Sequence, residues 1–258
     1  MIDTHCHIHD DEFNIDAATV IGNAQEAGVT KMICIGTTTE TSQQAINTAQ
    51  KYDNVWAAVG VHPHDAGGHI DKMSTIKQLA TAPRVIAIGE CGLDYYYLNS
   101  SKQDQAMVLR EQLAIAQAYN LPVSFHNRGS KQNPQDAFDD LWQILEDYPG
   151  IRGVIHSFTG NTNQLEQILD RGLYVALNGI ITFSNDESQL AMAAAVPLEK
   201  MLLETDAPFL TPSPFRGTIN EPKNVRYVAE FLASIRPTDS LETITQQTTR
   251  NAEDLFGI

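Results

Sequence analysis

Short apolar runs rich in β-branched residues alternate along the chain with polar loops and amphipathic stretches. Runs of this length and composition predict buried β-strands. Eight of them occur, at residues 2–5, 29–36, 55–61, 85–90, 121–126, 152–156, 173–178 and 201–205.

Apolar residues at helical spacing mark the stretches between these runs. Ala17, Ile21, Ala24 and Ala27 share one helical face, and Gly28 supplies a stop. Similar faces occur at Ala106, Leu109, Leu113 and Ala116; at Leu165, Ile168 and Leu169, between an Asn161 cap and Gly172; and at Val225, Val228, Ala229 and Leu232. Residues 241–256 predict a last helix that packs outside the ring of strands.

Eight strands that alternate with helices within 258 residues predict an α/β fold. The best match is a single (β/α)₈ TIM barrel that spans residues 1–258 as one domain. An open, doubly wound sheet is the alternative. Because no glycine-rich phosphate turn follows the first strand, a dinucleotide-binding version of that sheet is disfavoured.

Composition excludes several classes of protein. An apolar content of 42% at this length can bury a core, which argues against disorder and against a small disulfide scaffold. There is no long apolar run and no signal-peptide pattern at the start, so we expect no membrane association. Three cysteines suit a reducing compartment, so we expect a cytoplasmic protein, with no obligate protein partner evident.

The net charge of −15 argues against a long basic surface for duplex DNA. It leaves open a nuclease that takes one strand end with the help of metal ions.

Six of the eight histidines lie at or just beyond the ends of predicted strands: His5, His7, His62, His64, His126 and His156. Glu90 ends the fourth strand, and Asp206 follows the eighth. In a parallel barrel these ends meet on one face, where active sites are built. We therefore expect His5, His7, Glu90, His126, His156 and Asp206 to surround one point at the barrel mouth.

These side chains are candidate metal ligands. The spacing of His5 and His7 points both imidazoles to one side of a strand. Imidazole and carboxylate together suit Mg, Mn, Zn, Ni or Fe. Six ligands are more than one ion usually needs, so two divalent ions bridged by a carboxylate are expected. A single histidine is more often a core or surface residue, and His9 and His69, which lie in loops, are interpreted in that way.

The same residues belong to longer motifs that resemble one family along nearly the whole chain. The motifs are Ile2-Asp3-Thr4-His5-Cys6-His7; Gly60-Val61-His62-Pro63-His64; Ile88-Gly89-Glu90-Cys91-Gly92-Leu93-Asp94-Tyr95-Tyr96; Leu121-Pro122-Val123-Ser124-Phe125-His126-Asn127-Arg128; Gly153-Val154-Ile155-His156-Ser157-Phe158-Thr159-Gly160; Leu202-Leu203-Glu204-Thr205-Asp206-Ala207-Pro208; and Arg216-Gly217 with Asn220-Glu221-Pro222. In this order and spacing they resemble the TatD family of metal-dependent hydrolases.

The resemblance implies a deoxyribonuclease that hydrolyses phosphodiester bonds, often from the 3′ end, with divalent metal. It also implies the ligand sets. His5, His7, Glu90 and Asp206 would hold one ion; Glu90, His126 and His156 would hold the second, with Glu90 as the bridge. His62 would face the scissile group. Related barrels use a carboxylated lysine as the bridge, but this chain has no lysine between Lys77 and Lys102.

Two segments depart from the family pattern. Residues 129–135 are longer and more polar than the usual continuation after Arg128. The loop Arg216-Gly217-Thr218-Ile219-Asn220 lacks two basic side chains that family members often carry. Fewer phosphate contacts predict a weaker grip on a long nucleic acid, so single-stranded ends or short oligonucleotides are the expected substrates.

The residue chemistry suggests a role for each candidate. Asp206 can accept the proton of an attacking water and can also ligate an ion. With Glu90 and His62 it makes up the expected catalytic set. His62, Arg128 and Arg216 are candidates to bind phosphate, for which the planar guanidinium is well suited.

Residues around this set have simpler interpretations. Tyr95, Tyr96 and Tyr97 can either stack bases or pack the loop. Cys6 and Cys91 are interpreted as packing residues. Glu204 is a candidate to orient a ligand.

Three functions compete on this evidence. The first is a metal-dependent phosphodiesterase or deoxyribonuclease. The second is a metal-dependent carboxylic ester or amide hydrolase, such as an aminoacyl-tRNA deacylase, which would use the same ions on a carbonyl carbon. The third is a metal-stabilised binding module, which requires saturated coordination; the ligand set leaves room for water and disfavours it.

Overall fold

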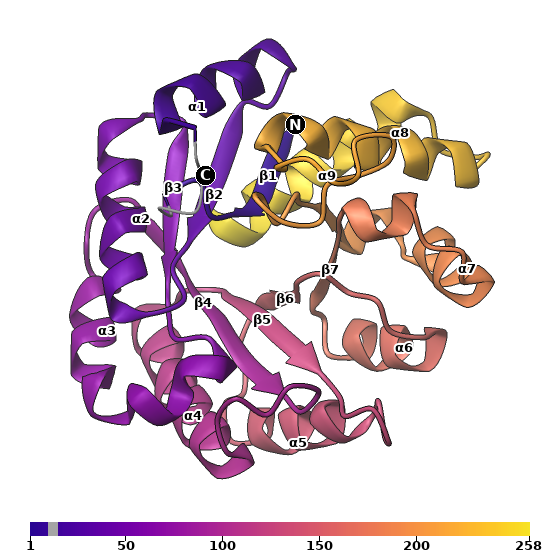
Figure 1. Ribbon diagram of the computed structural model, residues 1–258. Coiled ribbons are helices and arrows are strands. Elements are labelled where there is room, and N and C mark those ends of the chain that lie inside the picture. Colours follow the sequence, from indigo (N-terminus) through magenta and orange to yellow (C-terminus); the bar gives the residue numbers. More distant parts are fainter. Residues whose placement is uncertain (10–14) are drawn as a thin grey trace. The chain divides into compact units, whose positions relative to one another are not determined.

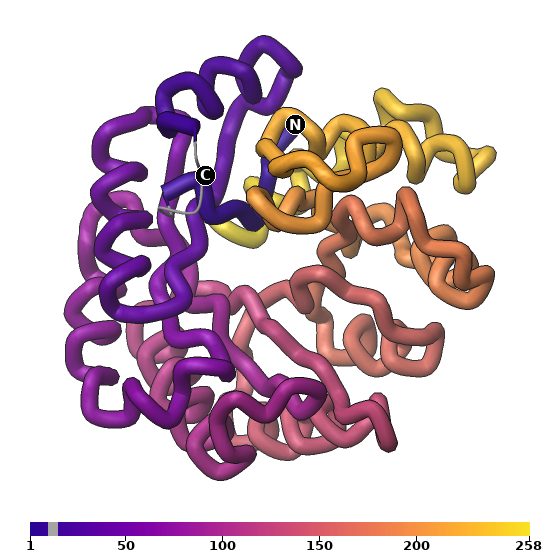
Figure 2. Tube along the Cα trace, in the orientation of Figure 1, coloured from indigo at the N-terminus to yellow at the C-terminus, as the bar shows by residue number. Residues whose placement is uncertain are grey.

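The computed structural model describes residues 1–9 and 15–258. All eight predicted strands are present, and the sheet takes them in chain order from β1 to β8. The chain divides into two compact units: a terminal unit, Met1–Cys34 with Ser157–Ile258, and a central unit, Ile35–His156. That residues 1–258 form one domain stays a prediction. In both units the trace alternates between strand and helix (Figure 2).

The terminal unit contains four strands and most of the helices named in the sequence. Its elements are β1 (Ile2–Cys6), α1 (Ala17–Glu26), β2 (Lys31–Ile35, whose last residue lies in the central unit), α6 (Thr162–Asp170), β7 (Tyr174–Leu177), α7 (Glu187–Ala195), β8 (Met201–Leu203), α8 (Val225–Ile235) and α9 (Leu241–Phe256). Strand β1 pairs in parallel with β2, and β7 with β8. A parallel bridge between Cys6 and Ala207 joins the end of β1 to the segment after β8.

The central unit contains β3 to β6 and four helices. Its elements are α2 (Thr39–Lys51), β3 (Val55–Val59), α3 (Met73–Leu79), β4 (Val85–Asp94), α4 (Lys102–Tyr119), β5 (Val123–Arg128), α5 (Asp136–Leu145) and β6 (Gly153–Ile155). Parallel pairs run from β3 to β4, from β4 to β5 and from β5 to β6. Helix α2 lies alongside β3, and α4 packs against β4 (Figure 1).

Local signals fix the helices where the sequence places them. The Asn161 side chain accepts the Gln164 backbone N–H, and the Gln164 side chain accepts that of Asn161, so the predicted cap of α6 is confirmed. The predicted face of α8 is buried, and α9 has the predicted bounds. No helix within the described residues is both long and apolar enough to cross a membrane.

Strand β4 differs from the prediction in one consequential way: it continues four residues past Glu90, to Asp94. Backbone pairing of β4 with β5 extends to Asp94 opposite Arg128. Gly92 permits this close approach, because its φ is +149° and a Cβ there would lie 1.9 Å from the carbonyl oxygen of His126. Since side chains alternate along a strand, the extension places Asp94 on the same face as Glu90.

Candidate metal centre

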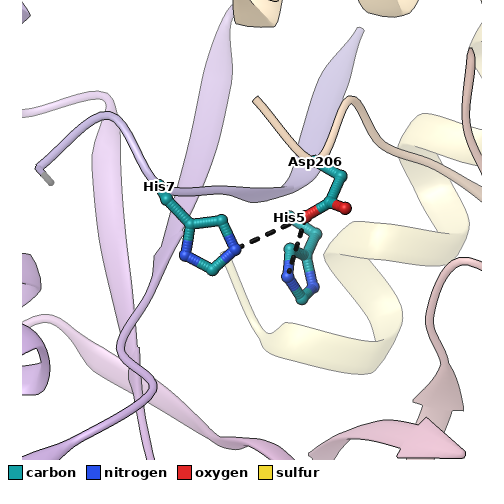
Figure 3. Close-up of side chains that lie close together, drawn as sticks. All are labelled: His5, His7 and Asp206. Atoms are coloured by element: carbon teal, nitrogen blue, oxygen red, sulfur yellow. Dashed lines mark ion pairs between the residues drawn. The ribbon is translucent and has the colours of Figure 1, made fainter. Parts of the chain in front are cut away.

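The terminal unit brings His5, His7 and Asp206 together (Figure 3). Asp206 Oδ1 lies 3.6 Å from His5 Nε2 and 3.4 Å from His7 Nε2. The histidines come from the end of β1, and Asp206 follows β8. Side chains from the two ends of the sequence therefore bring their possible ligand atoms close together, as the sequence predicts for these three residues.

Backbone and buried hydrogen bonds hold this terminal cluster in place. The Asp206 N–H donates to the His5 carbonyl at 2.9 Å, and the His7 N–H donates to Ala207 at 2.7 Å. Asp206 itself has a left-handed φ of +58°. Asp3 is fully buried, and its carboxylate accepts the Thr205 N–H at 2.9 Å and the His5 N–H at 3.3 Å. Asp3 thus links, by hydrogen bonds, the backbone of His5 in β1 to that of Thr205, the residue before Asp206.

Asp3 is a structural group rather than a free carboxylate. Burial raises the pKa of Asp3 to about 8, although the hydrogen bonds from Thr205 and His5 work in the opposite direction. The Thr205 hydroxyl also bonds to Asp3, at 2.5 Å. None of this was anticipated from the sequence, in which Asp3 was only a position in a motif.

The central unit holds a second cluster, built around one oxygen of Glu90. Glu90 Oε1 lies 2.8 Å from His156 Nε2, 2.9 Å from His126 Nδ1 and 3.4 Å from His62 Nε2. Burial acts to raise the pKa of Glu90, but His156, His62 and His126 together outweigh it and hold that pKa well below its usual range. Glu90 is therefore a buried anion among imidazoles.

The tautomer of His62 follows from its neighbours. The His64 backbone N–H donates to His62 Nδ1 at 3.0 Å, so the ring proton is assigned to Nε2, which faces Glu90. Burial lowers the pKa of His62 to about 4, with a further lowering by His126, so the ring is neutral at pH 7. His62 is thereby suited to donate a hydrogen bond rather than to supply positive charge.

Asp94 is a member of this site that the sequence interpretation missed. Its Oδ2 lies 2.9 Å from His126 Nε2 and 3.2 Å from His64 Nε2, and the residue is fully buried. Burial acts to raise the pKa of Asp94, but the hydrogen bonds from His126 and Tyr97 outweigh it and lower that pKa. Asp94 could have been predicted from its spacing to Glu90, because residues an even number of positions apart in one strand point to the same face.

The contact with Asp94 fixes which nitrogen of His126 is available. Burial acts to lower the pKa of His126, but hydrogen bonds with Asp94 at Nε2 and with Glu90 at Nδ1 outweigh it and raise that pKa. With its Nε2 proton held by Asp94, His126 would offer Nδ1 to a cation beside Glu90 and His156. Metal-ligating histidines in proteins commonly donate their other ring N–H to a carboxylate in this way. His126 therefore has the geometry of an oriented ligand.

Both clusters fit divalent cations by the chemistry of their donors. One atom from each of His5, His7 and Asp206 lies within 4.8 Å of the others, and Glu90 Oε1 lies 2.9 Å from His126 Nδ1 and 2.8 Å from His156 Nε2. Neutral imidazole nitrogens combined with carboxylate oxygens suit ions of borderline softness. Three of the four residues implied for one ion, His5, His7 and Asp206, thus lie together, as do Glu90, His126 and His156, which are implied for the other. Their role as ligands and the convergence of all six stay predictions.

The two arginines predicted to bind phosphate both stack on aromatic rings. The Arg128 guanidinium lies 4.0 Å from the ring centroid of Tyr96, and that of Arg216 lies 3.8 Å from the centroid of Phe183. Arg216 also donates to the Thr211 carbonyl at 3.0 Å. Both residues are exposed, and stacking restrains each planar group. Contact with substrate stays a prediction for both.

Other predicted neighbours of the site have structural partners. Glu204 is fully buried, and its Oε1 accepts the Ser157 N–H at 2.6 Å and the Asn178 amide at 3.2 Å. Cys6 and Cys91 are buried free thiols, and burial raises the pKa of Cys91, which disfavours a nucleophilic thiolate. Residues 129–135 form the turn before α5, where the Ser130 N–H donates to Asp136 at 2.9 Å.

Asp94→Asn is expected to weaken binding of a divalent ion by about 10- to 100-fold, the usual cost of losing an outer carboxylate partner. A neutral amide no longer favours the Nε2–H form of His126, although it can still accept backbone N–H groups. Calorimetric titration of the metal-free protein with Mn²⁺ or Zn²⁺ measures the change. Asp53→Asn, at an exposed position of the same unit, is the control. An affinity that stays equal to that of the control would contradict the orienting role.

Parallel strands alternating with helices, with histidines and carboxylates in and just past the C-terminal parts of the strands, define a barrel hydrolase of the metal-dependent class. Residues 2–257 match the family model described as TatD related DNase. The chain belongs to this TatD family, a family of metal-dependent hydrolases. The resemblance seen in the sequence motifs is thereby confirmed.

Individual relatives share the whole length of the chain. It is 36% identical over 261 residues to "Uncharacterized metal-dependent hydrolase YabD" of Bacillus subtilis, covering 100% of this chain and 99% of the relative. It is 36% identical over 266 residues to "3'-5' ssDNA/RNA exonuclease TatD" of Citrobacter rodentium, covering 100% of this chain and 98% of the relative.

Solved structures confirm the fold class. The crystal structure of YJJV, a TatD homologue from Escherichia coli, has a TM-score of 0.90 at 31% identity and covers 100% of this chain and 98% of that one. The phosphotriesterase homology protein of Escherichia coli has a TM-score of 0.69 at 15% identity, covers 99% of this chain and 98% of that one, and shows the fold alone. The fold is a single eight-stranded parallel α/β barrel, as predicted.

Proposed function

We propose that this protein is a cytoplasmic nuclease that hydrolyses phosphodiester bonds at the 3′ end of single-stranded DNA or RNA with two divalent ions. The observation that carries the proposal is the pair of ligand clusters, one in each unit, each combining imidazole nitrogens with a carboxylate. Among the relatives, the protein of Citrobacter rodentium is named an exonuclease on single-stranded DNA and RNA. The ion is Mg, Mn, Zn, Ni or Fe by donor chemistry.

His5, His7 and Asp206 would hold one ion, and Glu90, His126 and His156 the other. Bound there, divalent cations would lower the pKa of a coordinated water toward neutrality and neutralise charge on phosphate oxygens. Asp206 is the group that accepts the water proton, since its carboxylate is partly exposed beside His5 and His7. His62 supplies a neutral N–H donor next to Glu90.

Substrate phosphates are bound by the exposed edges of Arg128 and Arg216, whose planes rest on aromatic rings. Lys223, a third basic residue that follows Arg216 in the sequence, is already paired with Glu221 at 2.5 Å. Few free cations therefore oppose the general repulsion of a polyanion by a chain of charge −15. Such a site holds a strand end and does not track a duplex.

The proposal predicts faster cleavage of a short single strand than of blunt duplex DNA at an equal concentration of ends. The rate should fall only modestly with salt, because few counterions are released. Rates on 3′-labelled strands of both kinds, at two salt concentrations and with each candidate metal, measure this. A panel of carboxylic esters and an aminoacyl-tRNA serve as the contrast substrates.

Two results would overturn the proposal. Equal or faster duplex cleavage with a steep salt dependence would indicate an extended basic surface. Hydrolysis of the carboxylic esters or of aminoacyl-tRNA, with no cleavage of any phosphodiester, would assign the ions to carbonyl chemistry instead.

A further inference from the structure

Three consecutive tyrosines follow β4, and they differ sharply in exposure. Tyr95 is buried, and its hydroxyl donates to Asp140 at 2.7 Å. Tyr96 is half-buried, and 56% of Tyr97 is exposed. Packing therefore explains Tyr95, whereas the Tyr97 ring contacts Tyr96 with its centroid 4.8 Å away and still leaves more than half of the residue exposed.

We propose that Tyr97, supported by Tyr96 and Arg128, is the surface on which one nucleobase of the substrate strand stacks. This inference rests on the proposed nuclease function, because it names the part of the substrate that the central unit recognises. Stacking on an aromatic face tolerates every base, since each has a π-face. The surface would thus distinguish a nucleic acid strand from a simple phosphodiester without reading its sequence.

The position of Tyr97 beside the metal cluster is the first support. Its ring lies 5.5 Å from that of His64 in an edge-to-face arrangement at 87°. The His64 ring in turn lies 4.4 Å from that of His62, which faces Glu90. The exposed ring is therefore one imidazole removed from the ligand cluster, where the base next to a bound phosphate can reach it.

Asp94 fixes the ring relative to that cluster. Its Oδ1 accepts the backbone N–H groups of Tyr96 and Tyr97, each at 2.9 Å, while its Oδ2 contacts His126 and His64. One buried carboxylate thus holds both the turn that carries the aromatic ring and the imidazole that serves as a ligand. A preformed stacking surface loses less entropy when a strand binds.

Charge around the rings is the third support. The Arg128 guanidinium lies 4.0 Å from the centroid of Tyr96 and 5.1 Å from that of Tyr97, and Lys131 Nζ lies 4.5 Å from the centroid of Tyr96. Neither cation has a carboxylate partner among residues 1–9 and 15–258. Aromatic faces combined with unpaired cations are the combination that binds single-stranded nucleic acid, with rings for bases and charge for phosphates.

The test combines removal of the Tyr97 ring with removal of single nucleobases from the substrate strand. The substrates are a short single strand and matched strands with an abasic residue at each of the last three positions in turn. Tyr97→Ala is expected to lower kcat/KM on the intact strand about tenfold. At one abasic position the same variant should lose markedly less, because the partner of the ring is already missing. Tyr97→Phe should retain the rate, since it keeps the aromatic face.

Tyr119→Ala is the matched control, since Tyr119 is an exposed tyrosine at the end of α4. It should behave as the unmodified protein on every strand. An equal loss for Tyr97→Ala on the intact strand and on all abasic strands would overturn the inference, because the ring would then act independently of the base.

A binding measurement separates this inference from the proposed function. A strand that carries 2-aminopurine and phosphorothioate linkages resists cleavage, and stacking on a ring quenches its fluorescence. Quenching that is lost in Tyr97→Ala and kept in Tyr97→Phe supports the stacking surface even if no phosphodiester is hydrolysed. Unaltered quenching in Tyr97→Ala, when the protein cleaves the corresponding unmodified strand, would overturn the inference and leave the function standing.

Discussion

Glu90→Gln is expected to remove at least one divalent ion per chain and to lower hydrolytic activity by about a thousandfold. The amide keeps the size of the side chain but loses the negative charge that three imidazole nitrogens surround within 3.4 Å. A neutral amide oxygen is a poor ligand for a divalent ion. Loss of several kcal/mol of charge stabilisation in the transition state corresponds to a rate loss of about this size.

The fold should survive the substitution, because a neutral side chain costs less to bury than a carboxylate. Metal content after dialysis, measured by elemental analysis, and circular dichroism test the two statements separately. Glu111→Gln, on the exposed face of α4, is the control. Unchanged metal occupancy in Glu90→Gln would refute its role as a ligand. The bridging role implied by the family resemblance stays a prediction beyond this experiment.

Much of the fold could be predicted because its elements follow clear periodicities. The eight apolar runs became strands, and the capped faces at 162–170 and 241–256 became helices. Helix α2 is harder to detect, since most of its residues are polar and the buried aliphatic ones are only Ala45, Ile46 and Ala49. It depends on a capping box at Thr38 rather than on a broad apolar face.

That His5, His7 and Asp206 lie together, and Glu90, His126 and His156 likewise, could be predicted because each stands at or near a predicted strand end. Their role as ligands stays a prediction. The orienting groups could not be predicted, because their roles depend on hydrogen bonds rather than on residue type. The predicted strand ended at Glu90, the first charged residue after the apolar run, whereas backbone pairing with β5 carries β4 on to Asp94. The tautomer of His62 likewise depends on a single backbone N–H from His64.

Asp206→Asn is expected to lose the ion of the terminal cluster and to lower activity by about a thousandfold, the middle of the range for general base catalysis combined with the loss of a ligand. Asp206 Oδ1 lies 3.4 Å from His7 Nε2 and 3.6 Å from His5 Nε2, which is the arrangement of a shared ligand sphere. An asparagine there provides a weaker oxygen donor and cannot accept a proton from water.

Excess metal separates the two duties of Asp206. Raising the concentration of the ion should refill the terminal cluster and restore part of the rate, while a deficit of about a hundredfold persists because the proton acceptor is absent. Asp254→Asn, an exposed position in α9, controls for charge. Full recovery of the rate with excess metal would show that Asp206 acts only as a ligand. A lower rate with unaltered metal content would show that Asp206 acts only as the base, because His5 and His7 would then hold the ion without it.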